Sequence, residues 1–329
     1  MMKSILKTTL SQNVAKAFGV TLLLTIAANV YAGEMVDKTI DTSSSPKVDI
    51  EHVNGKAEIR VWDKSQVRVT GELGERTEEF IFEQRGDVVV IHVEVERSSQ
   101  SWYKKVKDGD DLTIYVPASS DLHYTAVNAD VKASGITRAV DVEVVNGDVM
   151  LQDIAERVEV ESVNGDIELK NVRGRLEVES VNGDLDIEHT GSESVSFTSV
   201  NGKVEVKTNS PDVTVETVNG RIDLALGDVD SLDIDTVNGR TFASLSINAN
   251  GRVNANSVGG AMEFQFQPNV SAQFDIGAHA GGNIINKISD VQAKKPKYGP
   301  SRSLRFINNG GAADVEISTV HGRIVLDQK

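Results

Sequence analysis

The chain of 329 residues contains no cysteine, which excludes disulfide bonds, thiolate catalysis and cysteine-ligated metal sites. Its 49 Asp and Glu residues outnumber 34 Lys and Arg residues, and a formal charge of −15 argues against nucleic acid and anionic membrane surfaces as partners. Aromatic residues make up only 5% of the chain, which excludes a large aromatic core.

Residues 1–32 have the composition of a secretory signal peptide. Three Lys residues give a positive start, an apolar run follows, and Val30-Tyr31-Ala32 matches a small-residue cleavage site. The apolar run is shorter than the roughly 20 residues needed to cross a bilayer, so cleavage is expected rather than anchoring. We expect an exported protein of the periplasm or cell surface, with no membrane span after cleavage. Cleavage would remove three Lys residues and no acid, which changes the formal charge of the mature chain from −15 to −18.

Residues 33–117 are expected to form a polar lead-in and a less regular, β-rich N-terminal cap. Apolar and polar residues alternate there in short runs, which is the period of a half-buried strand. The runs lie at 48–51, 57–61, 67–69, 80–82, 88–95 and 112–116. They do not keep the later spacing, and the terminal units of a repeat array have to cover an exposed edge. A polar loop at 98–111 carries Trp102 and Tyr103, which either contact a partner or fold back over the cap.

Residues 118–329 are dominated by one short unit centred on Val-Asn-Gly, and they continue the cap as one elongated domain. Successive copies are 18, 18, 19, 18 and 19 residues apart. Their asparagines are Asn146, Asn164, Asn182, Asn201, Asn219 and Asn238. Near-alternating runs rich in Val and Ile flank each Asn-Gly, so each unit contains two strands. A period near 20 indicates a repeat fold in which each unit buries its apolar side against its neighbours.

Two all-β folds are compatible with this unit. Asn-Gly is a strong hairpin signal, so each unit could be an antiparallel hairpin. Alternatively, each unit is one coil of a single-stranded parallel β-solenoid (β-helix), in which every strand pairs with its copy one period later. The Val before each Asn favours the solenoid, because a corner can turn this side chain inward whereas a hairpin exposes it in every unit. In a solenoid the asparagines form a structural corner and can make an amide ladder.

Stacking of the coils predicts a column formed by the residue after each Gly. Its members are three acids followed by three bases: Asp148, Asp166, Asp184, Lys203, Arg221 and Arg240. Three carboxylates about 5 Å apart repel one another, and a bound Ca²⁺ would relieve the repulsion because Ca²⁺ takes oxygen ligands. Solvent and nearby Arg residues can also neutralise them, and no other metal or cofactor is expected. The bases of the column are candidates for contact with a charged partner.

The outward acids that precede each corner raise the question of catalysis, because glycoside cleavage requires paired carboxylates. These acids recur in every unit, for example Glu159, Glu161, Glu177, Glu179, Asp233 and Asp235. An active site instead needs one special coil with loops that enclose a pocket. No catalytic residue is therefore assigned. The six histidines have no metal-binding spacing and are interpreted as surface or turn residues.

The order of these features resembles the bacterial putative-adhesin strand-repeat family, an exported domain of unknown function. The resemblance rests on the opening Val53-Asn54-Gly55 strand pair, the Gly/Asn-centred repeats and the stretches 112–122 and 315–324, and it spans about residues 46–329. It implies a right-handed-type β-solenoid on an envelope protein, with no catalytic residues to transfer. It also implies a link to envelope-stress regulation in some relatives.

These observations predict a non-catalytic, adhesin-like binding or scaffold module that presents a long acidic face to an envelope protein or glycan. A periplasmic envelope-stress or regulatory component is the first alternative. A polysaccharide-active β-helix enzyme is the second, and the uniformity of the repeats disfavours it.

Overall fold

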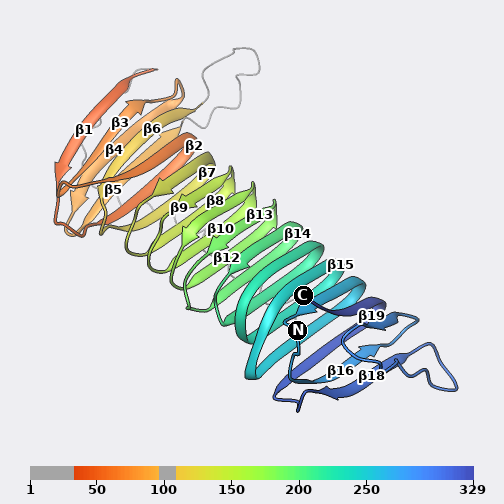
Figure 1. Ribbon diagram of the computed structural model, residues 1–329. Helices are drawn as coiled ribbons and strands as arrows, with labels where there is room; N and C mark the ends of the chain where they lie inside the picture. Colours follow the sequence, from red (N-terminus) through yellow and green to blue (C-terminus); the bar gives the residue numbers. More distant parts are fainter. Residues whose placement is uncertain (1–32, 96–108) are drawn as a thin grey trace, which may run out of the picture.

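The computed structural model describes residues 33–95 and 109–329, and these residues form strands, turns and loops without a helix. Successive coils stack into an elongated body with the strands β1 to β6 at one end and β16 to β19 at the other (Figure 1). The expected signal peptide, residues 1–32, and the contact candidates Trp102 and Tyr103 lie outside the described residues. Within the described ranges no helix is long and apolar enough to cross a membrane.

Six strands form the N-terminal end. They are β1 (Met35–Asp41), β2 (Lys47–Trp62), β3 (Gln66–Glu72), β4 (Thr77–Arg85), β5 (Val88–Val95) and β6 (Asp110–Pro117). Three pairings here are antiparallel: β1 with β3, β3 with β6, and β4 with β5. β2 lies parallel to β5, β6 and β7 (Asp121–Ser134), so it joins this end to the first coil of the repeat. The antiparallel strands supply backbone partners that a first coil would otherwise lack.

The repeat continues through eight further strands. They are β8 (Val140–Asn146), β9 (Val149–Gln152), β10 (Val158–Asn164), β11 (Ile167–Val172), β12 (Leu176–Asn182), β13 (Leu185–His189), β14 (Val195–Thr208) and β15 (Asp212–Phe266). The segments before and after each Asn-Gly corner pair in parallel with their copies in the next coil. Like residues therefore lie opposite each other, as in the pairs Glu159–Glu177 and Asn164–Asn182. This pairing excludes the hairpin alternative for these coils.

The stacked segments create two outward faces around one core. We call the outward side chains before each corner the front face, and those after each corner the back face. Inward side chains alternate with them, as strand geometry requires. In β10 and β11, for example, Val158, Val160, Ile167 and Leu169 are at most 1% exposed. These residues stack on their copies and form one aliphatic core along the axis.

The Val before each Asn is not sealed in the core, contrary to our prediction. Strand alternation continues into the corner, so Ser162 is inward at 1% exposure while Val163 is only half-buried. Val127, Val258 and Val320 occupy the same position in degenerate copies, with exposures of 39%, 49% and 37%. The parallel stack is present, but the position of this Val was the wrong reason to expect it.

Four strands close the C-terminal end. They are β16 (Ala272–Ala278), β17 (Asn283–Asn286), β18 (Arg302–Asn308) and β19 (Ala313–Gln328). β19 lies parallel to the last coil of β15 on one side and to β16 and β17 on the other. It is therefore inserted between strands that precede it in the sequence. β18 runs antiparallel to β16.

The predicted all-β class is confirmed. The body is not a regular single-stranded solenoid throughout, because antiparallel strands flank the parallel coils at both ends. The insertion of β19 also departs from a simple progression of coils.

Candidate binding faces

A ladder of asparagine side chains runs along the corner of the coils. The Nδ2 atom of each Asn donates to Oδ1 of the Asn in the preceding coil, at distances of 2.8–3.2 Å. The structure places all six asparagines of the sequence repeat in this ladder, and Asn54 and Asn128 extend it. Because every bond joins two coils, the ladder fixes their register from outside the core.

The Gly after each Asn allows the coils to approach closely. Gly165 has a φ of 141°, a conformation that residues with a side chain rarely adopt. A Cβ atom at this position would lie 2.0 Å from the carbonyl oxygen of Gly147 in the preceding coil. The corner therefore needs Gly both for its backbone conformation and for the spacing of the stack.

The acids of the predicted column accept backbone hydrogen bonds on the back face. Oδ1 of Asp148 accepts from the backbone N–H of Asp166 at 3.0 Å, and Oδ1 of Asp166 accepts from that of Asp184 at 2.9 Å. Oδ1 of Asp184 in turn accepts from the N–H of Lys203 at 2.7 Å. These carboxylates therefore join successive coils, a role that sequence spacing alone did not indicate.

The bases of the same column are partly neutralised by acids of the chain. Lys203 and Arg221 lie opposite each other in adjacent coils. Lys203 pairs with Glu205, and Arg221 pairs with Asp223 at 2.6 Å. Arg240 follows its Gly at the corresponding position and is exposed. Contact of these bases with a charged partner stays a prediction.

The calcium site considered for the acidic part of the column also stays a prediction. Asp148 and Asp166 line a hollow of about 530 Å³ on the back face, together with Lys56. Within residues 33–95 and 109–329, no group of three or more His, Asp or Glu side chains is placed to hold a metal ion.

Two rows of carboxylates follow the front face of β8, β10 and β12. We call these six side chains the acidic face: Asp141, Glu159 and Glu177 in one row, and Glu143, Glu161 and Glu179 in the other. All six are half-buried. Arg157 pairs with Glu159 at 2.8 Å, and His123 lies 3.4 Å from Asp141. The other four carboxylates have no ion-pair partner among the described residues.

Burial and the neighbouring charges raise the pKa values of three of these carboxylates, those of Glu143, Glu161 and Glu179. Burial raises the pKa of Glu161 to about 7, and the charges of Glu143 and Glu179 add to the effect. Burial likewise raises the pKa of Glu143 and that of Glu179. A hydrogen bond to Asp141 raises the pKa of His123. Negative charge is therefore held on this face at a free-energy cost that a bound cation would reduce.

The back face differs because some of its acids have basic partners on their own strands. Glu168 pairs with Lys170, and Asp223 pairs with Arg221. Acid and base are two residues apart in each pair, so both side chains point to the same face. Asp186 and Glu188 on the same face have no ion-pair partner among the described residues, but they are exposed to solvent, whereas the acids of the acidic face are half-buried.

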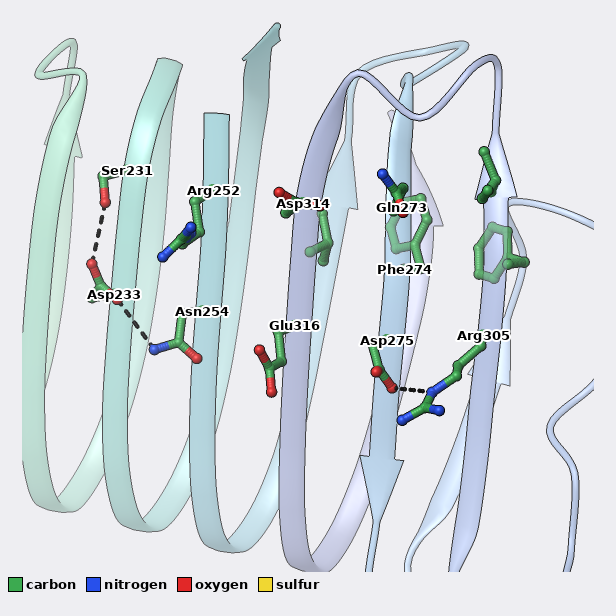
Figure 2. Close-up of a pocket in the computed structure, with 13 residues that line it drawn as sticks. Ser231, Asp233, Arg252, Asn254, Gln273, Phe274, Asp275, Arg305, Asp314 and Glu316 are labelled. Carbon is green, nitrogen blue, oxygen red and sulfur yellow. Dashed lines mark hydrogen bonds and ion pairs between the residues drawn. The ribbon is translucent and has the colours of Figure 1, made fainter. Parts of the chain in front are cut away.

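A groove of about 810 Å³ lies at the C-terminal end of the front face (Figure 2). Its charged side chains come from β15, β19, β16 and β18: Asp233, Arg252, Asp314, Glu316, Asp275 and Arg305. Asn254 donates to Asp233 at 3.2 Å, and Arg305 donates to Asp275 at 2.9 Å. The groove is thus a mixed polar surface spread over neighbouring strands.

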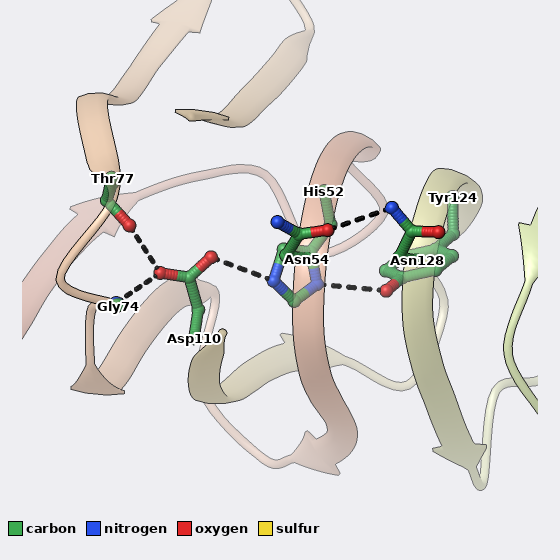
Figure 3. Close-up of polar contacts among 7 residues, drawn as sticks. All are labelled: His52, Asn54, Gly74, Thr77, Asp110, Tyr124 and Asn128. Atoms are coloured by element: carbon green, nitrogen blue, oxygen red, sulfur yellow. Dashed lines mark hydrogen bonds and ion pairs between the residues drawn. The ribbon is translucent and has the colours of Figure 1, made fainter. Parts of the chain in front are cut away.

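A buried network links three residues of the N-terminal end that are far apart in sequence (Figure 3). Tyr124 Oη lies 3.1 Å from His52 Nδ1, and His52 Nε2 lies 3.1 Å from Asp110 Oδ2. Oδ1 of Asp110 accepts from the Gly74 N–H at 2.6 Å and from the Thr77 hydroxyl at 2.7 Å. Burial acts to raise the pKa of Asp110, but these hydrogen bonds outweigh it and lower the pKa. Sequence reasoning missed this network because no spacing connects its members.

His52 and His189 are core residues, which corrects their interpretation as surface or turn residues. Each is 2% exposed. Nε2 of His189 donates to the carbonyl of Gly174 at 2.7 Å, and Nδ1 lies 2.8 Å from the Thr208 hydroxyl. Burial lowers the pKa of His189. Both imidazoles therefore join neighbouring segments from the inside of the stack.

Parallel coils, an Asn-Gly corner and two extended polar faces together define a strand-repeat protein. The chain belongs to the Toastrack DUF4097 family, whose model matches residues 39–289. This confirms the family resemblance indicated by the sequence. β18 and β19 lie beyond the matched stretch, although part of the resemblance rested on residues 315–324.

The chain is also similar to two solved structures. One is a "putative cell adhesion protein" from Clostridium sporogenes, with 10% identity, a TM-score of 0.20, and coverage of 90% of this chain and 100% of that chain. The other is a "putative adhesin" from Bacteroides fragilis, with 12% identity, a TM-score of 0.33, and coverage of 89% and 97%. No curated protein matches the chain.

Proposed function

We propose that this chain is a non-catalytic binding module, exported to the cell envelope, whose acidic face contacts a positively charged partner. The carboxylate rows repeat at the spacing of neighbouring strands, about 4.8 Å. A protein segment with several Lys or Arg residues can meet both rows with its amino or guanidinium groups. A basic segment of an envelope protein is therefore the partner that we propose.

The observation that carries this proposal is the stacking of half-buried, unpaired carboxylates on the acidic face. On the back face, Glu168 and Asp223 have Lys or Arg partners of their own, and the unpaired Asp186 and Glu188 are exposed to solvent. On the acidic face, Glu143, Glu161 and Glu179 follow one another across adjacent strands and have no such partner among the described residues. Like charges directly opposite each other destabilise a sheet. A bound cation would convert this cost into binding free energy.

Export is proposed from the composition of residues 1–32, with its Lys residues, apolar run and small-residue site ending at Ala32. Amino-terminal sequencing of the chain isolated from the envelope fraction tests this part. We expect the isolated chain to begin at Gly33. Recovery of the uncleaved chain from the cytoplasm would contradict export.

The catalytic alternative is less well supported by the geometry. Glycoside hydrolysis needs a pair of carboxylates held around one bond in a shaped pocket. In the groove of Figure 2, Asp233 accepts from Asn254 and Asp275 pairs with Arg305. The acidic face repeats the same arrangement from coil to coil, so it supports contact along a length rather than chemistry at one point.

Titration calorimetry with a synthetic peptide of alternating Lys and Thr tests the binding proposal. The informative variant combines Glu143→Gln, Glu161→Gln and Glu179→Gln. We expect its affinity to be at least about tenfold lower than that of the natural chain, because three desolvated carboxylates are lost from the contact. Binding by the natural chain should weaken as salt is added.

The matched control combines Asp186→Asn, Glu188→Gln and Asp228→Asn, three exposed acids outside the acidic face. It changes the net charge by the same amount and should keep most of the affinity. Equal losses in both variants would show a non-specific charge effect and contradict the proposal. Binding of an amine-bearing glycan in place of the peptide would reject the proposed partner.

A further inference from the structure

The two ends of the body carry opposite charge. Residues 33–95 contain fourteen Asp and Glu against eight Lys and Arg. Residues 283–329 contain eight Lys and Arg against four Asp and Glu, so this end is basic in a chain with a formal charge of −15. Opposite charge at the two ends favours contact between the end of one copy and the beginning of another.

The strands before each corner form one stacked layer, and its terminal strands, β4 and β18, have backbone groups at their outer edges. β4 pairs with β5, and β18 pairs with β16; among the described residues neither has a strand on its other side. Ser303 of β18 exchanges backbone hydrogen bonds with Lys294 on the outer edge. In a strand, the backbone N–H and C=O groups of every second residue point to the same edge. The backbone groups of Arg305 and Ile307 therefore point to the same outer edge as those of Ser303. Such an edge is a template for pairing with another chain.

The side chains at the two edges are complementary. In β18, Arg305 lies on the outer face and Ile307 is 67% exposed. In β4, Ile81 lies opposite His92, and Glu79 lies opposite Glu94. Two acids directly opposite each other are unfavourable, and an Arg from another chain would relieve this pair.

We propose that copies of this chain associate head to tail, with β18 of one copy pairing alongside β4 of the next. β4 and β18 are both antiparallel to the strands of the coils. If a second copy is shifted along the long axis without rotation, its β4 therefore lies parallel to β18 of the first copy. Placing Ile307 beside Ile81 in this arrangement also places Arg305 beside Glu79. The inward side chains Phe306 and Phe80, which are only partly buried, come together in the same register.

This contact uses different surfaces on the two partners, so it propagates instead of closing at a dimer. The acidic face stays exposed and is repeated from copy to copy. The inference stands on the two ends alone and does not depend on what the acidic face binds.

Sedimentation velocity of the purified chain tests the proposal. We expect the natural chain to form species larger than a monomer at low salt, in amounts that rise with protein concentration and fall with added salt. Arg305→Glu and Glu79→Arg should each be monomeric alone, because each places like charges at the contact. An equimolar mixture of the two variants should associate again, since every contact between unlike copies then joins an Arg to a Glu.

Arg173→Glu makes the same charge change as Arg305→Glu at an exposed position away from both ends, and it should associate like the natural chain. Circular dichroism should be the same for all variants, because Arg305 and its partner Asp275 are largely exposed. A natural chain that stays monomeric at low salt would overturn the proposal. Association of either variant alone, or a mixture that stays monomeric, would do the same.

Discussion

The side-chain amide of Asn164 donates a hydrogen bond to Oδ1 of Asn146, 2.9 Å away in the preceding coil. The same bond recurs from coil to coil along the corner. Each Asn donates to the Asn of the preceding coil and accepts from the Asn of the next coil. An Asp in the ladder therefore lacks the donor, and its carboxylate oxygen faces the amide oxygen of the preceding Asn.

Asn164→Asp should therefore destabilise the fold by about 1 kcal/mol, the usual net value of one hydrogen bond. The loss should be modest because the ladder is exposed to solvent. Urea unfolding measures it, with Asn209→Asp as the control at an exposed asparagine outside the ladder. Equal effects of the two substitutions would show that the ladder adds no stability.

Gly165→Ala should cost more than about 3 kcal/mol, because strain and a backbone clash act together. The added Cβ would meet the carbonyl oxygen of Gly147 at 2.0 Å, and only separation of two coils could relieve that contact. Gly299→Ala is the control, since Gly299 has a positive φ of 98°, beyond the left-handed helical region, but has nothing within 4 Å of an added Cβ. Thermal unfolding of both variants separates the clash from the backbone strain. Similar losses would contradict the close approach of the coils.

The repeat and its parallel stacking were predictable because the spacing of Asn-Gly is nearly constant and the flanking residues alternate. The position of Val163 was not predictable with the same rule. We assumed that the corner changes which side chain points inward, whereas alternation continues to Ser162 and the Gly makes the turn. An Asn-Gly pair in a strand-rich sequence therefore does not by itself define which neighbour is buried.

The contacts at the ends of the body could not be read from the sequence. His52, Asp110 and Tyr124 come from three different strands, and only the parallel pairing of β2 with β6 and β7 brings them together. The insertion of β19 between β15 and β16 likewise depends on a long connection and not on a local pattern. Local periodicity predicts the repeated coils, and long-range pairing decides how they are closed.

Ser180→Ala should leave stability unchanged or raise it by up to about 1 kcal/mol. The buried hydroxyl of Ser180 makes no hydrogen bond with any described protein group, and removing an unsatisfied polar group relieves its desolvation cost. Thr217→Val is the contrasting variant, because the Thr217 hydroxyl donates to Thr236 at 2.9 Å and its loss should destabilise. A clear loss of stability in Ser180→Ala, measured by urea unfolding, would show that this hydroxyl is hydrogen-bonded in solution.

Stability should fall as the pH rises from about 4.5 to about 7, in part because of Glu161. Its pKa is about 7 in the folded chain against an ordinary value of 4.5, so the folded state binds the proton more tightly. The resulting stabilisation is complete below pH 4.5 and is lost as the pH rises through 7. Glu161→Gln should reduce this slope and be more stable than the natural chain above pH 7, whereas the exposed Glu188→Gln should not. An unchanged slope in Glu161→Gln would contradict the raised pKa.

Asp110→Ala should destabilise the N-terminal end by about 3 kcal/mol or more, because the Gly74 N–H, the Thr77 hydroxyl and His52 lose a buried acceptor. The pKa of Asp110 is lowered by folding, so its contribution is present above the ordinary value of 3.8 and is lost in stronger acid. The variant should accordingly lose less stability on acidification than the natural chain does. Hydrogen exchange measured on β2, β6 and β7 would locate the effect, and a loss spread evenly over all coils would argue against a local network.

The most direct test of the central claim is an NMR titration of the Glu161 carboxyl group, with and without the Lys-Thr peptide. The acidic face is expected to hold unpaired charge that a cationic partner neutralises, so the pKa of Glu161 should fall from about 7 toward its ordinary value of 4.5 when the peptide is bound. A pKa that stays near 7 at saturating peptide would place the partner elsewhere and contradict binding at the acidic face.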